Sequence, residues 1–273
     1  MTYSYKHQVA PAHTQRNAAL QDRIVYEQPL NERIRTFLRL EFLFNQARAH
    51  TYKHTVWDSR AALSAIFDLV SLFGRADIKT EIIKELERHA GFLERLAANP
   101  EVNSSKLEEV LNELDLLIDR LHVLQTSELD VRSNEFLTSI RQRSAIAGGC
   151  CDFDLPAYHF WLSQPEEKRI LDLQSWLEPF DTIHRSLTLI LRLIRDSAHQ
   201  TQEIAQSGFY QKSADTNAVC QLVRVITDSD CPYFPEISGG KHRFTIRFMT
   251  PALKERAAQV TEDVPFTLSC CLL

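Results

Sequence analysis

The spacing of apolar residues changes once along this chain of 273 residues, near residue 200. Before that point apolar residues recur every three or four positions, which is the period of an amphipathic α-helix. After it they alternate with polar residues, which is the period of a β-strand. Runs of helices followed by runs of strands are typical of α+β proteins. We therefore predict an N-terminal all-helical domain followed by a C-terminal antiparallel β-sheet domain.

Three segments follow from this change of pattern. Residues 1–22 are polar and hold no period, so we expect a flexible N-terminal arm. Residues 23–200 form the predicted helical domain, and residues 201–273 form the predicted β domain. Helix starts are expected near Asn31, Asp58, Asp77, Ser104 or Ser105, and Asn134, with a capping box at residues 163–166. Strands are expected at residues 209–212, 219–226, 243–249 and 266–271.

The composition argues against several classes of function. The formal net charge of -5 opposes a general affinity for nucleic acid. Because there is no long apolar run and no secretory signal at the start, we expect a cytoplasmic protein without a membrane span. No phosphate-binding glycine motif occurs, and we expect no metal and no cofactor. Six cysteines without a CxxC pair are expected to be free thiols: Cys150, Cys151, Cys220, Cys231, Cys270 and Cys271.

Residues 241–248 of the predicted β domain alternate strictly between cationic or polar and apolar side chains. In a strand this alternation sends Phe244, Ile246 and Phe248 toward a core. The opposite face then carries a basic row of Lys241, Arg243 and Arg247. Guanidinium groups pair bidentately with carboxylates, and two of them four residues apart on a strand stand roughly 13 Å apart. This spacing suits an extended acidic peptide, whereas the alternative is an edge strand whose charges only keep the sheet soluble.

A third arginine can complete this basic site. Arg75 follows Gly74, the expected end of a helix, and so lies at a turn between helices. If that turn abuts the sheet, Arg75 joins Arg243 and Arg247 in a cleft at the domain junction. Domain junctions commonly hold binding sites.

Two other functional classes remain open at this point. The first is a thiol-dependent enzyme that uses Cys150 or Cys151 with His159, because a thiol near an imidazole can form an activated nucleophile. The second is a DNA-associated regulator that uses exposed arginines of the helical part. Its candidate residues are Arg35, Arg39, Arg141 and Arg143. The tryptophans Trp57, Trp161 and Trp176 are expected to be packing residues.

Several separated motifs of the chain carry a resemblance to a known family. They include Pro29-Leu30-Asn31-Glu32, Arg141-Gln142-Arg143, Gly148-Gly149-Cys150-Cys151, Ser207-Gly208-Phe209-Tyr210-Gln211 and Arg243-Phe244 through Phe248-Met249, with a paired cysteine near the end. In this order, from about residue 24 to the C-terminus, they closely resemble the ZapD family of bacterial cell-division proteins, which associate with the FtsZ ring.

The resemblance implies a non-enzymatic homodimer at the midcell division ring, with a helical domain and a β domain in each subunit. Each subunit is expected to bind the acidic C-terminal tail of FtsZ, so that the dimer cross-links and bundles protofilaments. The family's basic pocket matches Arg75, Arg243 and Arg247 here, with Lys241 in the same row. A second basic surface, linked to bundling, matches Arg39 and His159. The chain departs from that surface at Glu135, where the family can carry arginine.

Overall fold

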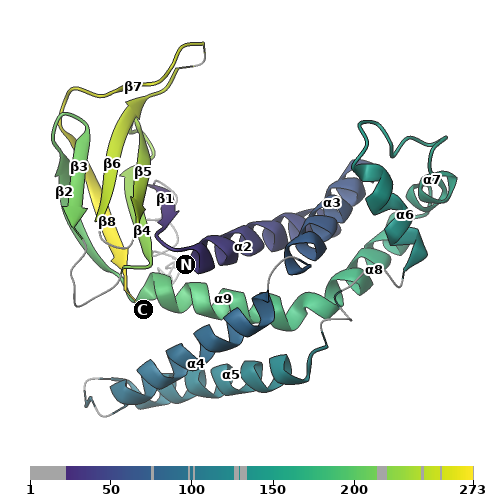
Figure 1. Ribbon diagram of the computed structural model, residues 1–273, viewed down its shortest axis with the longest axis horizontal. Coiled ribbons are helices and arrows are strands. Elements are labelled where there is room, and N and C mark those ends of the chain that lie inside the picture. The colour runs from purple at the N-terminus through teal and green to yellow at the C-terminus, as the bar shows by residue number, and fades with distance from the viewer. Residues whose placement is uncertain are drawn as a thin grey trace, which may run out of the picture. The chain divides into compact units, whose positions relative to one another are not determined.

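The computed structural model describes residues 23–74, 77–97, 99–100, 102–125, 129, 134–213, 220–240, 243–252 and 254–272. The chain divides into two compact units, one made of Met1–Arg35 with Ile194–Leu273 and the other of Thr36–Leu193. The first unit holds the strands and the second holds most of the helices (Figure 1), so the predicted α+β class is confirmed. The arm predicted for residues 1–22 lies outside the described residues.

The helices follow one another through the middle of the chain. They are α2 (Glu32–Thr51), α3 (Val56–Phe73), α4 (Ile78–Leu96), α5 (Ser104–Val123), α6 (Glu135–Ser144), α7 (Pro156–Leu162), α8 (Glu166–Leu177), the 3₁₀ turn η3 (Glu178–Phe180) and α9 (Asp181–Asp196). Helices α4 and α5 form a neighbouring pair (Figure 1). Of these described helices, none combines the length and the apolar character needed to cross a bilayer.

Short polar side chains begin several helices at the predicted places. The Oδ1 atom of Asn31 accepts a hydrogen bond from the Ile34 amide at 2.9 Å, which starts α2. Asp77 caps α4 and Asn134 caps α6 in the same manner. Each cap satisfies an amide that has no partner inside the helix.

Other helix ends differ from the prediction. Helices α3 and α5 begin earlier, after the caps Thr55 and Asn103. The capping box predicted at residues 163–166 is wrong, because the Ser163 hydroxyl donates to the carbonyl of His159 and no side chain caps α8. Helix α6 ends at Ser144, and a series of turns that includes Gly148 and Gly149 follows.

The helical core uses the residues of the expected period, with one exception. Ile183, Leu187 and Ile190 of α9 are almost completely buried. Phe44 of α2 is also buried, and its ring lies against neighbouring aromatic rings. The exception is Phe42, which is exposed because the buried stripe of α2 passes through positions 40 and 44.

The strands form two antiparallel sheets. The first has the order β1 (Arg23–Pro29), β4 (Leu222–Asp228), β8 (Val264–Cys271) and β2 (His199–Ala205). The second has the order β3 (Phe209–Ser213), β6 (Arg243–Thr250) and β5 (Phe234–Gly240), and β7 (Ala258–Gln259) also pairs with β6. Both sheets contribute to one apolar core, which includes Phe244, Ile246 and Phe248 from β6 and Phe266 and Leu268 from β8.

Strand β1 was not foreseen. Residues 23–29 were assigned to the helical domain, but they pair with β4 along its whole length, from Arg23 opposite Asp228 to Pro29 opposite Leu222. The β unit is therefore assembled from both ends of the described chain.

A tight turn carries the chain from β2 in one sheet to β3 in the other. Ser207 and Gly208 have φ angles of 48° and 71°, and two successive positive φ values are typical of a type I′ turn. A Cβ atom at position 208 would lie 2.4 Å from the Val260 carbonyl oxygen. Glycine is therefore required there, both for its φ and for this close approach.

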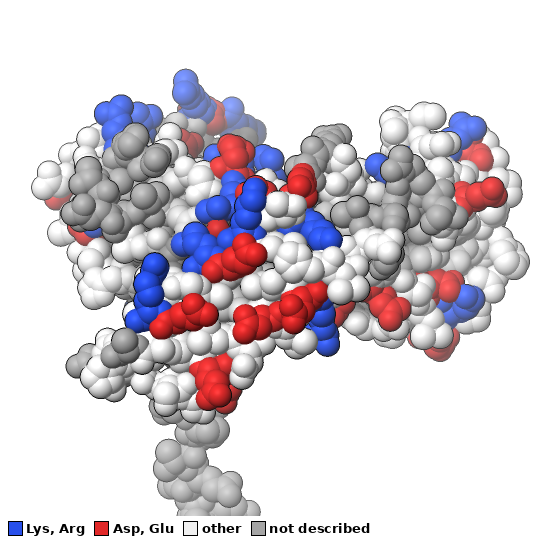
Figure 2. Space-filling view, turned by 60° about the horizontal axis from the view of Figure 1, so that its bottom comes forward, with Lys and Arg blue, Asp and Glu red and all other residues white. Residues whose placement is uncertain are grey.

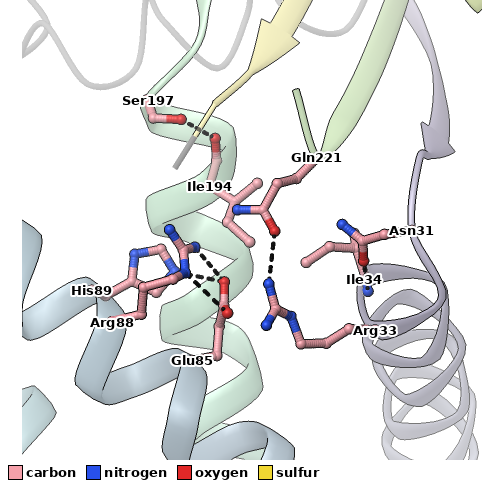
Figure 3. A network of polar contacts seen from close by, with 9 residues as sticks. All are labelled: Asn31, Arg33, Ile34, Glu85, Arg88, His89, Ile194, Ser197 and Gln221. Atoms are coloured by element: carbon pink, nitrogen blue, oxygen red, sulfur yellow. Dashed lines mark hydrogen bonds and ion pairs between the residues drawn. The ribbon is translucent and has the colours of Figure 1, made fainter. Parts of the chain in front are cut away.

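Figure 3 shows the polar contacts at the start of α2 and, separately, those within α4. The Arg33 guanidinium donates to Oε1 of Gln221 at 3.1 Å, and the Leu30 amide donates to the Gln221 carbonyl at 2.9 Å. These bonds hold the beginning of α2 beside the beginning of β4. In α4, buried Glu85 is paired with Arg88, one helical turn further along.

Candidate functional site

The outer face of the β3–β6–β5 sheet carries the predicted basic row. Strand β6 is the middle strand, and its residues alternate between buried and more exposed positions as predicted. Phe244, Ile246 and Phe248 lie in the core, while Arg243 and Arg247 are exposed on the opposite face. Neither arginine side chain forms a hydrogen bond or an ion pair with another described residue, and both residues are exposed to solvent.

The strand register decides what surrounds each arginine. Arg243 lies opposite Ser213 on β3 and Gly240 on β5, both of which are small. Arg247 lies between a phenylalanine, Phe209, and an acidic residue, Glu236. Directly opposite residues of an antiparallel pair have Cβ atoms about 4.5–5.5 Å apart. Glu236 therefore reduces the net positive field at Arg247, whereas Arg243 has no such neighbour in the two strands that flank it.

Apolar side chains share one end of this outer face. Phe209 is exposed beside Arg247. Met249 lies two residues after Arg247 on β6, directly opposite Phe234 on β5, and both of these apolar side chains are only partly buried. The face thus combines two cations with an apolar end. A peptide with both acidic and apolar residues matches this combination better than a small anion does.

Two of the predicted site residues cannot be placed. Arg75 and Lys241 lie outside the described residues. Helix α3 does end as expected, with Gly74 following its last residue. The meeting of Arg75 with Arg243 and Arg247 stays a prediction.

The second expected basic surface consists of residues on different helices. Arg39 is exposed on α2, and His159 is exposed on α7 with its Nδ1 atom 3.1 Å from Oδ1 of Asp152. Glu135 is the first residue of α6, where a negative charge is favoured by the helix dipole. No hydrogen bond or ion pair between described residues joins Arg39 to His159.

The arrangement around Cys150 does not resemble that of an activated thiol. The Cys150 sulfur lies 4.0 Å from the carbonyl oxygen of Ile140, and burial raises the pKa of this thiol. His159 contacts Asp152 instead of a cysteine. An activated cysteine needs a lowered pKa or an adjacent base, and the described geometry supplies neither. A cluster of three or more metal-ligating side chains is likewise absent from the described residues.

The arginines proposed for DNA binding are mostly engaged within the protein. Arg35 pairs with Glu32 at 3.2 Å, Arg143 lies 3.7 Å from Asp154, and Arg141 donates to the Ser71 hydroxyl. On the face drawn in Figure 2, acidic side chains lie among the basic ones, and they do not leave a continuous basic stripe. Nucleic-acid binding usually needs such a stripe.

An exposed apolar groove in the helical unit was missed by the sequence analysis. Trp161 and Trp176 are packing residues, with ring centroids 5.5 Å apart, but Trp57 is 77% exposed. It borders a groove of about 780 Å³ together with Ile146 and with Phe153, which is 83% exposed. This surface could not be predicted from the sequence, because Trp57, in the first turn of α3, and Phe153, in a loop, belong to no apolar stripe.

Arg60 forms the polar part of this groove. Its guanidinium carbon lies 5.5 Å from the centroid of the Trp57 ring and 4.9 Å from that of Tyr158. The same guanidinium donates to the Cys150 carbonyl at 3.1 Å. These contacts hold the loop that carries Cys150 against α3 and keep the apolar rim in place.

Comparison with known proteins identifies the family. The family model described as ZapD, cell division protein, matches residues 38–247. The chain is 45% identical over 255 residues to the cell division protein ZapD of Methylococcus capsulatus, covering 93% of this chain and 100% of that protein. It is 38% identical over 253 residues to ZapD of Coxiella burnetii (91% and 97%) and 39% identical over 256 residues to ZapD of Cupriavidus necator (91% and 99%). The chain therefore belongs to the ZapD family of cell division proteins.

Proposed function

We propose that this protein is a non-enzymatic adaptor that binds the acidic C-terminal tail of FtsZ and, as a homodimer, cross-links protofilaments at the midcell ring. The observation that carries the proposal is the outer face of β6, where Arg243 and Arg247 are exposed and have no partner among the described residues. The tail site also includes Arg75 and Lys241 in this proposal. Arg39 and His159 belong to a separate bundling surface.

The physical chemistry of the outer face suits a flexible acidic tail. Each arginine can hold a carboxylate through two charge-assisted hydrogen bonds. The exposed Phe209 adds an apolar contact beside Arg247. A disordered tail loses chain freedom when it binds, so a single site is expected to be weak to moderate. Because the site is exposed, salt should weaken the attraction over a Debye length of about 8 Å at physiological ionic strength.

Cross-linking requires two such sites in one particle. The groove in the helical unit supports the dimer, because Trp57, Ile146 and Phe153 expose apolar side chains around it. Large exposed apolar surfaces are uncommon on monomers and typical of homodimer interfaces. We propose a second copy of this chain as the occupant. Two linked sites on filaments that display many tails then raise the effective concentration, and binding becomes much tighter than at one site.

A peptide-binding titration tests the tail site. A labelled FtsZ tail peptide is titrated with the wild-type protein and with Arg243→Ala, Arg247→Ala and Arg75→Ala. Each variant should bind about tenfold or more weakly, since a hydrogen bond to a charged group contributes ~1.5–3 kcal/mol. Arg256→Ala is the matched control, because Arg256 is also exposed in the β unit but lies in the connection between β6 and β7, outside the basic row.

The outcome separates the tail site from a general charge effect. The control should bind like the wild type, and circular dichroism should be unchanged in all variants. Equal affinity for Arg243→Ala and the wild type would remove the outer face of β6 from the proposal. Co-sedimentation with full-length FtsZ and with FtsZ lacking its tail extends the test, and bundling should need the tail.

A further inference from the structure

Two cysteines of the β unit lie together at one end of its core. Cys270 is on β8, on the same side of that strand as Phe266 and Leu268, and is only partly buried. Cys220 lies two residues before β4 begins and is almost completely buried in the same core. The Gln221 amide donates to the Cys271 carbonyl at 2.9 Å, which holds this part of the chain beside the end of β8. The Cys220 thiol donates to the Leu222 carbonyl at 3.4 Å, and its sulfur also interacts with the thiol of Cys270.

The surroundings make the two thiols unequal. The interaction with the Cys220 thiol lowers the pKa of Cys270, and the charge of Lys212 on β3 acts in the same direction. Burial and the charge of Glu203 oppose this effect but do not cancel it. The same interaction, together with burial, raises the pKa of Cys220. Cys270 is thus the better nucleophile, and Cys220 is held in contact with it as a thiol.

The neighbouring cysteine serves as an internal comparison. Cys271 follows Cys270 directly, but it lies on the other side of β8 and is completely buried. Burial raises the pKa of Cys271 to about 12. Two adjacent thiols therefore differ in both exposure and acidity, and the second one should be inert.

We propose that Cys270 and Cys220 are an oxidisable dithiol, in which Cys270 reacts first with a peroxide and Cys220 then closes an intramolecular disulfide. This site is independent of the proposed tail binding. All six cysteines are free thiols in the structure, so the described state is the reduced one.

The reaction balances with hydrogen peroxide as the oxidant. The Cys270 thiolate attacks one peroxide oxygen, the O–O bond breaks, and the hydroxide that leaves takes a proton to become water. Cys270 is now a sulfenic acid. The Cys220 sulfur, after losing its proton, attacks the Cys270 sulfur and displaces the hydroxyl group, which leaves as a second water. One disulfide and two waters result, and a dithiol reductant reverses the change.

Closing the bond requires the sulfurs to approach to about 2.05 Å. Cys220 precedes the ladder of β4 with β8, which begins at Leu222, so its backbone can adjust without breaking that ladder. The disulfide would tie the chain ahead of β4 to β8, and we expect a higher melting temperature for the oxidised protein.

Peptide mapping of the full-length chain tests the proposal without any variant. Reduced protein is treated with hydrogen peroxide, free thiols are blocked with N-ethylmaleimide, and the chain is cut with trypsin under non-reducing conditions. Cys220 then lies in the peptide 213–224, and Cys270 and Cys271 lie in the peptide 257–273. A linked pair of these peptides that separates on reduction is the expected result. Recovery of both peptides in blocked form, or a link between two chains, would overturn the proposal.

Three variants identify the sulfurs. Cys271→Ser is the matched control and should still form the link, whereas Cys270→Ser should lose it. Cys220→Ser should also lose it, and its Cys270 should then be trapped as a sulfenic acid by dimedone. A link that survives in Cys270→Ser and disappears in Cys271→Ser would show that the assignment is wrong. The mapping of the wild-type chain keeps its value even if one variant folds poorly.

Discussion

Glu27 on β1 is held by two arginines from different elements. Nε and Nη2 of Arg195, in the last turn of α9, lie 2.9 and 2.7 Å from the two carboxylate oxygens of Glu27. Nε of Arg224, on β4, lies 2.9 Å from the same carboxylate. All three side chains are only 20–23% exposed. One carboxylate thus compensates two partly buried positive charges, and no single element contains the whole network.

Replacing Glu27 by glutamine should therefore be costly. The change leaves the charges of Arg195 and Arg224 uncompensated, and we expect the free energy of unfolding to fall by roughly 1–3 kcal/mol. Asp228→Asn is the control, because Asp228 pairs with Arg23 at 3.9 Å between the same two strands but is 79% exposed. Its effect should stay below about 0.5 kcal/mol. Urea unfolding measures both, and equal losses would contradict this account of Glu27.

At the scale of the helices, α9 meets α2 through a half-buried histidine. Nδ1 of His184 lies 2.9 Å from NH1 of Arg48, and its ring centroid is 5.0 Å from that of Phe44. Burial lowers the pKa of His184, and the charge of Arg48 lowers it further. The neighbouring carboxylates Asp181 and Glu41 act against this shift but are weaker.

This lowered pKa predicts a pH dependence of stability. The fold favours neutral His184, so its contribution is fully present above the unfolded pKa of 6.5 and is lost as the pH falls through the lower, folded pKa. We expect the free energy of unfolding to decrease between about pH 7.5 and 5.5. The decrease should be smaller in His184→Gln, which keeps a hydrogen-bond acceptor but cannot titrate there. Parallel curves for the two proteins in denaturant titrations would exclude His184 as the source.

Some of the strands could be predicted from the sequence, and others could not. β6 and β8 were predicted because apolar and polar residues alternate within each of them. β5 contains Pro235 and ends in Gly239 and Gly240, which usually break strands. It forms because β6 offers a full ladder of partners, and Gly239 is even required, since a Cβ there would lie 2.5 Å from that of Phe244. β1 was also missed because it depends on a partner strand. That partner, β4, lies about 200 residues further along the chain.

The candidate site was predictable only in part. The alternation of residues 243–248 predicted the exposed arginines correctly, since a period of two belongs to a single strand. Their neighbours Phe209 and Glu236 follow from the register of β3 and β5, which one strand cannot specify. The exposed Trp57 could not be foreseen either, because an isolated tryptophan is usually buried.

At the scale of the whole molecule, the proposed function depends more on the number of tail sites in one dimer than on the affinity of a single site. A single chain with a weak tail site would coat filaments without linking them. Two sites in one dimer make the second binding event intramolecular, which can raise the overall affinity by about 10²–10⁴. A variant that stays folded and binds tails but no longer dimerises would separate these two contributions.

Phe153→Asp should be such a variant. Phe153 is 83% exposed at the rim of the apolar groove, so its replacement removes little packing within one chain but places a charge in the proposed interface. We expect monomers in analytical ultracentrifugation, unchanged affinity for the tail peptide, and loss of FtsZ bundling in co-sedimentation. Leu171→Asp, at an exposed apolar position of α8 outside this groove, should remain dimeric and active. A dimeric Phe153→Asp would move the interface elsewhere, and a monomeric variant that still bundles filaments would show that cross-linking does not need the dimer.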